Sequence, residues 1–452
     1  MRRGAAADAA LVPAALAPLR RVREQLRYVH SPHRFNIVPA GRRGGKTERA
    51  KRKLFKAAMR AFNLKHGKRG RFFAAAPTRQ QAKNIWWADL KAMTRLYWTK
   101  TPSETELTIY LPFADIVVVG MDVPERIEGA PWDGGVLDEY ANMKEQAFTA
   151  NVRPALSDRL GWCDLIGVPE GRNHYYDRWQ SALAMQQEKG AASLWGAYTW
   201  FSAVVLPPSE IEAAREDLDQ LTFEQEYEAS FINFLGRAYY GFSTQNTAAL
   251  RQHYNPNAPL AACFDFNVSP GVMAVAQELR MPNAAHSVTG VLGEVYIENN
   301  SNTVMVCEKF VNDWGNHQGL IEVYGDATGG ARKTSALSGS DWDLVKVTLR
   351  AHFGPRVDFK VPPSNPSERA RVNAVNVRCL NAAGQRRLLV DGAHAPHVVK
   401  DLDGVRVIQG GSGEIDKKHD RRLTHVSDAL GYYVVTRFPV ARMGVSSLAL
   451  ST

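Results

Sequence analysis

The amino-acid sequence predicts a chain of two α/β domains, the first built on a mainly parallel sheet. At 452 residues the chain is too long for one ordinary hydrophobic core. Its first half alternates short apolar runs with helical patterns, which is typical of a parallel sheet. Its second half opens with successive strand-like runs and closes with a helical pattern, so we expect a second domain with its own sheet.

Composition indicates a globular protein with a polyanionic partner. Hydrophobic residues make up 45% of the chain and charged residues 23%, both ordinary fractions. The formal net charge of +10 favours nucleic acid as a partner, although a basic surface can also serve solubility alone. The 4 cysteines are far apart and form no CxxC pair, so we expect no zinc site and a reducing compartment. No apolar run is long enough to span a bilayer, so no membrane partner is expected.

The elements of the first domain follow from their periodicity. The Ala-rich start over 1–30 predicts a flexible arm that ends in a helix near 22–29. Leu54, Ala58 and Phe62 share one face of a helix over 49–62. The segments 107–111 and 115–120 flank a short turn and predict a hairpin. Further strands are expected at 34–40, 71–77, 134–139 and 162–168, and further helices at 78–93 and 207–231.

The second domain is expected to begin after a loop-rich stretch over 233–259, with the boundary near residue 240. Apolar runs with strand character then follow one another. Strands are expected at 260–267, 271–279, 288–298, 303–311 and 320–326, and a late helix at 422–438.

The segment Ala40–Thr47, AGRRGGKT, lies between an expected strand and an expected helix, as a phosphate loop requires. Glycine lets backbone amides curl around phosphate oxygens, Lys46 can reach the β- and γ-phosphates, and Thr47 can ligate Mg²⁺. The pattern GxxxxGK[ST] expects glycine where this chain has Ala40, and a chance GGKT in a basic loop is the alternative. The expected nucleotide-binding residues are Gly41, Arg42, Arg43, Gly44, Gly45, Lys46 and Thr47.

A second acidic motif, VLDE at Val136–Glu139, follows about 90 residues later in the α/β pattern. Asp138 would hold the magnesium of ATP and Glu139 would polarise the attacking water, whereas an exposed acidic strand end is the plain alternative. Arg42 inside the loop and Arg126 before the acidic strand could stabilise charge on the γ-phosphate, one within the subunit and one from a neighbour. For each arginine a solvated surface role is equally open.

Three aspartates of the second half are expected to meet at one sheet edge. Asp265 lies on the first strand, Asp326 ends a later strand and Asp428 lies on the late helix. Clustered carboxylates suit Mg²⁺ or Mn²⁺, and two such ions can drive phosphodiester cleavage. Each aspartate alone is more often a cap or a turn residue.

Other polar residues of the second half are weaker candidates for metal or DNA binding. Glu308 is a further candidate ligand, and His425 lies three residues before Asp428, on roughly the same helix face. The basic cluster KKHDRR over 417–422 could hold a DNA backbone, although a solvated loop is the usual case.

In this order the motifs resemble those of the large terminase subunits of tailed bacteriophages. Each motif is weak alone, but their order and spacing together are specific. The matching segments are GRRGGKT (41–47), APTRQQA (76–82), ERIEGAPWDGGVLDEYANM (125–143), RPALSDRLGW (153–162), GVPEGRNHYYDRW (167–179), FEQEYEASF (223–231), CFDFNVSPGVMAVAQ (263–277), VYGDATGG (323–330) and HVSDALGYYV (425–434).

The resemblance implies two catalytic domains. It implies a P-loop motor ATPase domain of the additional-strand type over 31–240, a linker over 241–260, an RNase H-like nuclease domain over 261–440 and a flexible tail over 441–452. It implies that Arg42 is the arginine inside the family's phosphate loop, and that Arg126 lies where some members place an arginine acting on a neighbouring subunit.

The same resemblance assigns further roles by position. It implies that Lys46, Thr47 and the Asp138–Glu139 motif bind ATP and magnesium. It also implies that Asp265, Asp326 and Asp428 bind the metal ions of the nuclease. GVPEG with Asn173 matches the segment that couples hydrolysis to movement. Many members have Thr where this chain has Val168, so the residue that senses the γ-phosphate stays open.

The implied function is viral genome packaging. ATP hydrolysis would move double-stranded DNA into the procapsid, and the nuclease would cut the DNA concatemer. The implied partners are double-stranded DNA, a portal ring, a small terminase subunit and further copies of the chain in a ring, commonly a pentamer. The place of action would be the host-cell cytoplasm and, transiently, the procapsid, without secretion.

Three other readings remain open. A DNA helicase or repair ATPase with an accessory nuclease would separate strands, whereas a packaging motor would not. A DNA-binding scaffold with dead sites would lack the key acids, which are present here. A metabolic kinase would leave the second half of the chain without a role.

Overall fold

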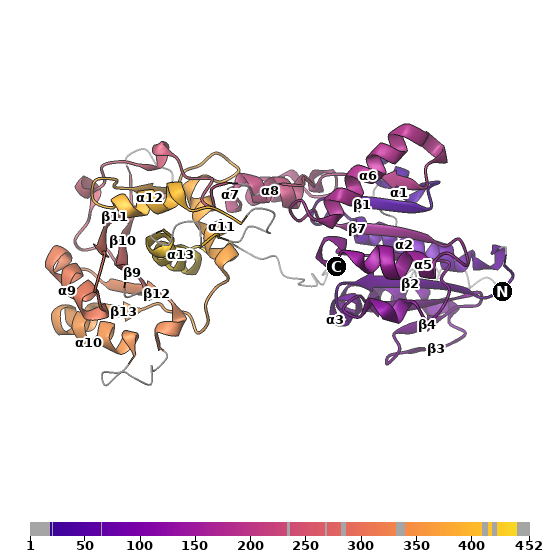
Figure 1. Ribbon diagram of the computed structural model, residues 1–452, viewed down its shortest axis with the longest axis horizontal. Helices are drawn as coiled ribbons and strands as arrows, with labels where there is room; N and C mark the ends of the chain where they lie inside the picture. Colours follow the sequence, from indigo (N-terminus) through magenta and orange to yellow (C-terminus); the bar gives the residue numbers. More distant parts are fainter. Residues whose placement is uncertain are drawn as a thin grey trace, which may run out of the picture. The chain divides into compact units, whose positions relative to one another are not determined.

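The computed structural model describes residues 19, 21–64, 66–232, 236–266, 269–281, 286–330, 340–408, 415–417 and 423–440. The chain divides into two compact units, Met1–Ile211 with Glu224–Asn233, and Glu212–Phe223 with Phe234–Thr452. Each unit has its own sheet (Figure 1). Among the described residues, the helices are too short or too polar to cross a membrane.

The sheet of the first unit runs in the order β3-β4-β5-β2-β6-β7-β1-β8. Neighbouring strands from β5 to β8 pair in parallel, and β4 forms the predicted hairpin with β5. The mainly parallel sheet predicted for this half is therefore confirmed. The strands are β1 Phe35–Pro39, β2 Gly70–Ala76, β3 Lys100–Ser103, β4 Thr108–Tyr110, β5 Ala114–Gly120, β6 Gly134–Leu137, β7 Trp162–Gly167 and β8 Trp195–Ala197.

Helices cover both faces of this sheet, because successive residues of a strand point to opposite sides. On β2, Phe72 packs into one core with Leu54, and Phe73 packs into the other with Tyr175. The helices that lie wholly in this unit are α1 Arg23–Val29, α2 Lys46–Met59, α3 Arg79–Ala82, α4 Ala88–Thr94, α5 Arg153–Ala155 and α6 His174–Lys189. Two further helices, α7 Pro208–Asp217 and α8 Gln220–Tyr227, each have residues in both units. The single helix predicted over 207–231 is thus two helices, and residues 228–231 lie outside both.

The sheet of the second unit runs in the order β13-β12-β9-β10-β11-β14. The strands β9, β10 and β11 form an antiparallel meander, and β12 pairs with β9 in parallel. The strands are β9 Leu260–Asp265, β10 Gly271–Leu279, β11 Val288–Ile297, β12 Ile321–Gly325, β13 Val357–Phe359 and β14 Leu388–Val390. The parallel pairing puts the carboxyl ends of β9 and β12 side by side.

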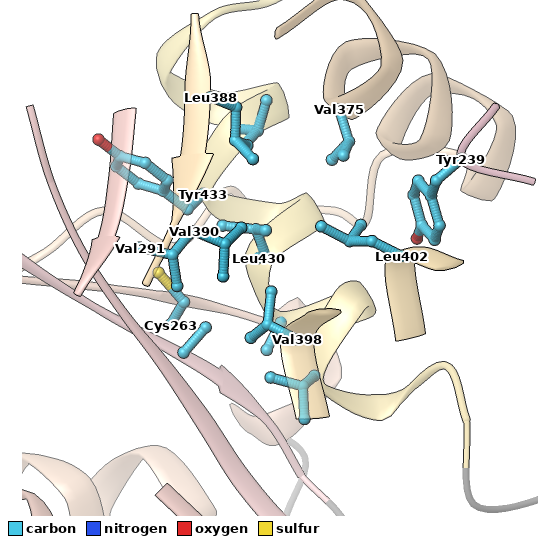
Figure 2. Close-up of a cluster of buried hydrophobic side chains, with 14 of the residues drawn as sticks. Tyr239, Cys263, Val291, Val375, Leu388, Val390, Val398, Leu402, Leu430 and Tyr433 are labelled. Atoms are coloured by element: carbon cyan, nitrogen blue, oxygen red, sulfur yellow. The ribbon is translucent and has the colours of Figure 1, made fainter. Parts of the chain in front are cut away.

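Two groups of helices cover the faces of the second sheet (Figure 1). Leu430 and Tyr433 of the late helix pack with Cys263, Val291 and Val398 in one core (Figure 2). Phe310 packs into the opposite core. The helices are α9 Thr303–Trp314, α10 Asp341–Phe353, α11 Glu368–Cys379, α12 Pro396–Gly404 and α13 His425–Arg437.

One element of the second domain was predicted wrongly. The segment 303–311 was expected to be a strand, but it lies within the helix α9. Its valines favour a strand, yet its buried residues Val306, Cys307, Phe310 and Trp314 recur at helical spacing. The Asn302 side chain accepts a hydrogen bond from the Met305 N–H and caps the helix.

Candidate functional site

The loop over Ala40–Gly45 joins the fully buried strand β1 to the helix α2. Gly45 adopts a φ of 77°, a left-handed conformation that glycine tolerates, and α2 has no side-chain cap. The first N–H groups of a helix have no partner inside the helix, so this end of α2 is suited to an anion. Lys46 and Thr47 are the first two residues of α2.

Other parts of the first unit hold the loop in place. The carbonyl oxygen of Gly44 accepts hydrogen bonds from Gln25 Nε2 and Trp200 Nε1, each at 2.7 Å. Ser202 Oγ donates to the carbonyl oxygen of Arg42 at 2.6 Å. Ala40, where the motif expects glycine, is fully buried, and its N–H donates to the Gly167 carbonyl at the end of β7. Its methyl group therefore lies in the core, at the end of β1.

The two predicted halves of the nucleotide site meet in the structure. Thr47 Oγ1 donates to Asp138 Oδ2 at 2.9 Å, although β7 lies between the strands β1 and β6 that lead to these residues. The pKa of Asp138 is raised to about 7, first of all by its burial. The charge of Glu139 contributes to this increase, while Lys46 and Thr47 oppose it. A carboxylate in this position is short of positive charge.

Glu139 and the two candidate arginines lie in different settings. Glu139 has a φ of 55°, an uncommon conformation for a residue other than glycine, directly after Asp138. Arg42 forms an ion pair with Glu226, and its side chain is 43% exposed. Arg126 is exposed on a short helix over Pro124–Ile127 and lines a cavity of about 510 Å³ with Arg71 and Arg79. Arg42 is therefore paired with an acid beside the loop that contains it, whereas Arg126 is exposed on a separate short helix.

Residues 167–173, at and after the end of β7, contact three segments around the predicted nucleotide site. Besides the bond from Ala40 to Gly167, the Gly171 N–H donates to Gln225 Oε1 at 3.0 Å. Asn173 Nδ2 donates to the carbonyl oxygen of Ala141, also at 3.0 Å, just after the acidic motif. Residues 167–173 thus join the phosphate loop, the acidic motif and the segment Glu224–Asn233.

In the second unit, Asp265 and Asp326 lie at the carboxyl ends of two paired parallel strands. Phe264 of β9 pairs with Gly325 of β12, so the two aspartates stand at adjacent strand ends. Asn365 Nδ2 and the Thr328 N–H and hydroxyl all donate to Asp326 Oδ1, at 2.6–2.7 Å. Burial raises the pKa of Asp326, but these bonds and the charge of Arg371 outweigh it and lower the pKa overall. Asp326 is therefore held as a carboxylate.

Asp428 reaches the same region from the helix α13. Arg371 NH2 donates to Asp428 Oδ1 at 2.9 Å, and Lys417 Nζ lies 3.3 Å from Oδ2. All three acids act on the hydroxyl of Tyr432. Burial raises the pKa of this hydroxyl, and the negative charges of Asp326, Asp428 and Asp265 add to the increase. The three aspartates therefore share one electrostatic environment.

The side chains as they stand do not form a metal cage. Within the described part of the chain, no three Asp, Glu, His or Cys side chains converge closely enough to hold one ion. His425 Nδ1 lies 3.4 Å from Asp265 Oδ2, whereas Glu308 is exposed on α9. Of the basic cluster 417–422, only Lys417 lies among the described residues. The metal-ligand assignment thus stays a prediction.

Several residues that shape the sites were missed from the sequence. Trp200, Gln25 and Glu226 contact the phosphate loop, and Arg371 contacts Asp428. The segment containing Glu226 was predicted as part of a helix and of the family resemblance, but without a role at the loop. No local pattern marks the other three, since each contact joins residues far apart in the sequence.

We compared the sequence and the structure of the chain with those of known proteins. No family model matches the chain. The terminase large subunits of Thermus phage G20c and Thermus virus P23-45 are each 27% identical to it over 173 residues. This match spans only 34% of the chain and 34% of each relative. A large terminase from a thermophilic bacteriophage superposes with a TM-score of 0.54 at 16% identity, covering 92% of this chain and 99% of that one.

The chain has the fold of a phage large terminase. A second structure of the same thermophilic phage terminase, in complex with ADP, superposes with a TM-score of 0.52 at 14% identity, over 92% of this chain and 99% of that chain. The predicted fold class is therefore confirmed, and with it the predicted resemblance to large terminases. The terminase fold extends over both units, because the superposition covers nearly the whole chain.

Proposed function

We propose that the chain is a viral genome-packaging motor, in which the first domain hydrolyses ATP to move double-stranded DNA and the second domain cuts it. The observation that carries the proposal is the bond between Thr47 and Asp138, which joins the phosphate loop to the acidic motif across an intervening strand. The large-terminase fold and the three aspartates of the second unit support the nuclease half.

The loop residues fit a magnesium–nucleotide complex. The uncapped start of α2 offers N–H groups to phosphate, and Lys46 is the first residue of that helix. The Thr47 hydroxyl and Asp138 form the oxygen pair that magnesium prefers, and the buried carboxylate lacks positive charge. Magnesium supplies neutralisation of phosphate charge when it is bound. Gly41, Arg43, Gly44 and Gly45 would shape the cradle.

Glu139 is the proposed catalytic base. It follows the proposed magnesium ligand directly and has a left-handed backbone conformation. A carboxylate in this position can orient and polarise the attacking water. Arg42 would exchange Glu226 for the γ-phosphate, while Arg126, exposed at the surface, would act on the nucleotide of a neighbouring subunit.

Asp265, Asp326 and Asp428 are the proposed ligands for Mg²⁺ or Mn²⁺ in a two-metal nuclease. Hard carboxylate oxygens at adjacent strand ends suit both ions. As the side chains stand, however, Asp428 is paired with Arg371 and Lys417. The proposal therefore requires that Asp428 first leave these cations.

The proposed partners follow from the packaging role. They are double-stranded DNA, a portal ring, a small terminase subunit and further copies of this chain in a ring, with five as the proposed number. The net charge of +10 supports binding to DNA. The proposed place of action is the host-cell cytoplasm and the procapsid surface.

Two variants test whether the two activities are separate. Lys46→Ala should lower ATP hydrolysis by about 100-fold or more and leave metal-dependent plasmid cutting intact, because it removes a cation from the transferring phosphate. Asp326→Ala should do the reverse. Matched controls are Lys56→Ala, exposed on the same helix as Lys46, and Asp358→Ala, a half-exposed acid on the neighbouring strand β13. Loss of both activities in either test variant would contradict two separate sites.

A helicase-type DNA ATPase is the alternative function. It would also need the phosphate loop, so ATPase activity alone does not separate the two. A strand-displacement assay on a forked duplex does: the packaging proposal expects ATP hydrolysis stimulated by duplex DNA without strand separation, and displaced strands would favour the helicase.

A further inference from the structure

Arg371 is a buried arginine in contact with Asp428, one of the three aspartates (Asp265, Asp326 and Asp428) that we call the acidic edge of the second unit. It lies on α11 and is only 7% exposed. Its guanidinium carbon lies 4.5 Å from the centre of the Tyr432 ring, and its NH1 donates to the Pro366 carbonyl at 3.2 Å. Its Nε is buried and has no hydrogen-bond partner among the described residues. The guanidinium is therefore anchored, but one of its donors is unused.

The packing of two helices fixes this position. A Cβ added to Gly431 of α13 would lie 3.2 Å from the Cβ of Arg371, so α11 and α13 approach closely at this point. This approach brings the Arg371 NH2 group to Asp428, three residues before Gly431. The ion pair is thus set by the backbones of both helices.

The charges around Arg371 explain why an arginine is placed here. It donates a hydrogen bond to Asp428 directly, and its guanidinium lies over the ring of Tyr432, four residues after Asp428 on α13. Buried carboxylates are costly without a positive partner. Arg371 supplies that charge from inside the fold, and Lys417, half exposed, supplies a second charge at Asp428.

We infer that Arg371 is a resident counter-ion that competes with divalent metal for Asp428. The inference rests on the proposed nuclease function. While Arg371 holds Asp428, the third proposed ligand is not available, which agrees with the lack of a three-ligand cluster among the described residues. Metal binding requires the ion pair to open, so Arg371 sets the metal concentration at which the site fills. Arg371 is a positioning residue and makes no contact with the reacting atoms.

Direct measurement of Mn²⁺ binding tests the inference without relying on cleavage. The full-length chain is titrated with Mn²⁺ in the absence of nucleotide and DNA, and free Mn²⁺ is followed by electron paramagnetic resonance. Binding that disappears in Asp326→Ala is assigned to the acidic edge. Arg371→Met should tighten this binding by about tenfold or more, because the metal no longer displaces a buried cation. Arg371→Lys should restore weak binding, since it keeps the charge.

Lys417→Met is the matched control, since it removes one positive charge from the other oxygen of the same carboxylate. It should tighten Mn²⁺ binding much less than Arg371→Met, because Lys417 is half exposed and lies farther from Asp428. Equal tightening in both variants, or none in Arg371→Met, would overturn the inference.

Two further readouts separate other failures. If no variant shows Mn²⁺ binding that depends on Asp326, the proposed metal site itself fails, independently of Arg371. Thermal unfolding of each variant shows whether the second unit remains folded. If Arg371→Met does not fold, Arg371→Gln, which keeps polar contacts without the charge, carries the same test with the same expected tightening.

Discussion

Gly41 shows how little space surrounds the phosphate loop. A Cβ at this residue would lie 2.4 Å from Ser202 Oγ and 2.6 Å from the Tyr227 carbonyl oxygen. Both neighbours belong to segments that return to the loop from far along the sequence. A glycine is therefore needed here for close packing, and its φ is not in the left-handed region.

Gly41→Ala should weaken nucleotide binding by about tenfold to a hundredfold, because the loop must shift to relieve the overlap. Titration with a fluorescent ATP analogue measures the effect. Gly129→Ala is the control, because a Cβ at Gly129 would meet no atom within 4 Å. Unchanged affinity in Gly41→Ala would contradict this, because it would mean that the segments containing Ser202 and Tyr227 can move away without disturbing the loop.

Single residues also mark what sequence reasoning could reach. Lys46, Thr47 and Asp138 could be predicted as nucleotide-binding residues because a phosphate loop and its acidic partner have local patterns, and the structure brings Thr47 and Asp138 into contact. The contacts of Glu226 with Arg42 and of Arg371 with Asp428 span 184 and 57 residues. Such partners depend on how helices pack, and no local pattern encodes them.

At the scale of elements, the start of α13 depends on a buried acid from α12. Asp401 is 2% exposed, and its Oδ2 accepts hydrogen bonds from the Val426 and Ser427 N–H groups at 3.1 Å each. Burial raises the pKa of Asp401 to about 6, against the opposing bonds and the charge of His425. Asp428 lies one residue after this cap, so Asp401 orients the helix turn that carries it.

The raised pKa of Asp401 predicts a pH-dependent stability. The ordinary pKa is 3.8, so the native state favours the neutral acid. Its stabilising contribution is complete below about pH 4 and is lost as the pH rises through about 6. Relative to Asp401→Asn, the parent chain should lose up to about 3 kcal/mol of unfolding free energy between pH 4 and pH 7.

Urea unfolding at several pH values measures this difference. Asp403→Asn, an exposed acid on the same helix, should follow the parent at every pH. Parallel profiles for the parent and Asp401→Asn would mean that the two N–H bonds outweigh burial.

Elements were predictable where periodicity was long and were missed where it was short. The strands β1, β2 and β5 and the helix α13 follow their predicted ranges closely. The helix α2 begins and ends three residues earlier than predicted, so Phe62, expected on its buried face, lies outside the helix and is 60% exposed. The strand β8 has 3 residues, too few to show alternation. The segment 303–311 was assigned by its valines, although its burial is helical. Local preference and packing disagree there, and packing decides.

At the scale of the whole molecule, the net charge of +10 predicts how DNA binding responds to salt. If binding neutralises about 6–10 phosphates, duplex affinity should fall by about 1000-fold or more between about 50 and 200 mM salt. Fluorescence anisotropy with two unrelated duplexes of equal length should give the same slope, because phosphate contacts carry no sequence information. An affinity that depends on the sequence, or ignores salt, would contradict this.

The contacts of residues 167–173 have a consequence for how the protein tolerates change. Two of their three bonds use main-chain atoms on this segment, the Gly167 carbonyl and the Gly171 N–H. Substitution cannot delete the bond from the Ala40 N–H to the Gly167 carbonyl, which uses main-chain atoms on both sides, whereas the other two bonds depend on the side chains of Gln225 and Asn173. The end of β7 therefore stays attached to the loop whatever side chain stands at Val168, while the bonds to Gln225 and Ala141 are the ones that substitution can remove.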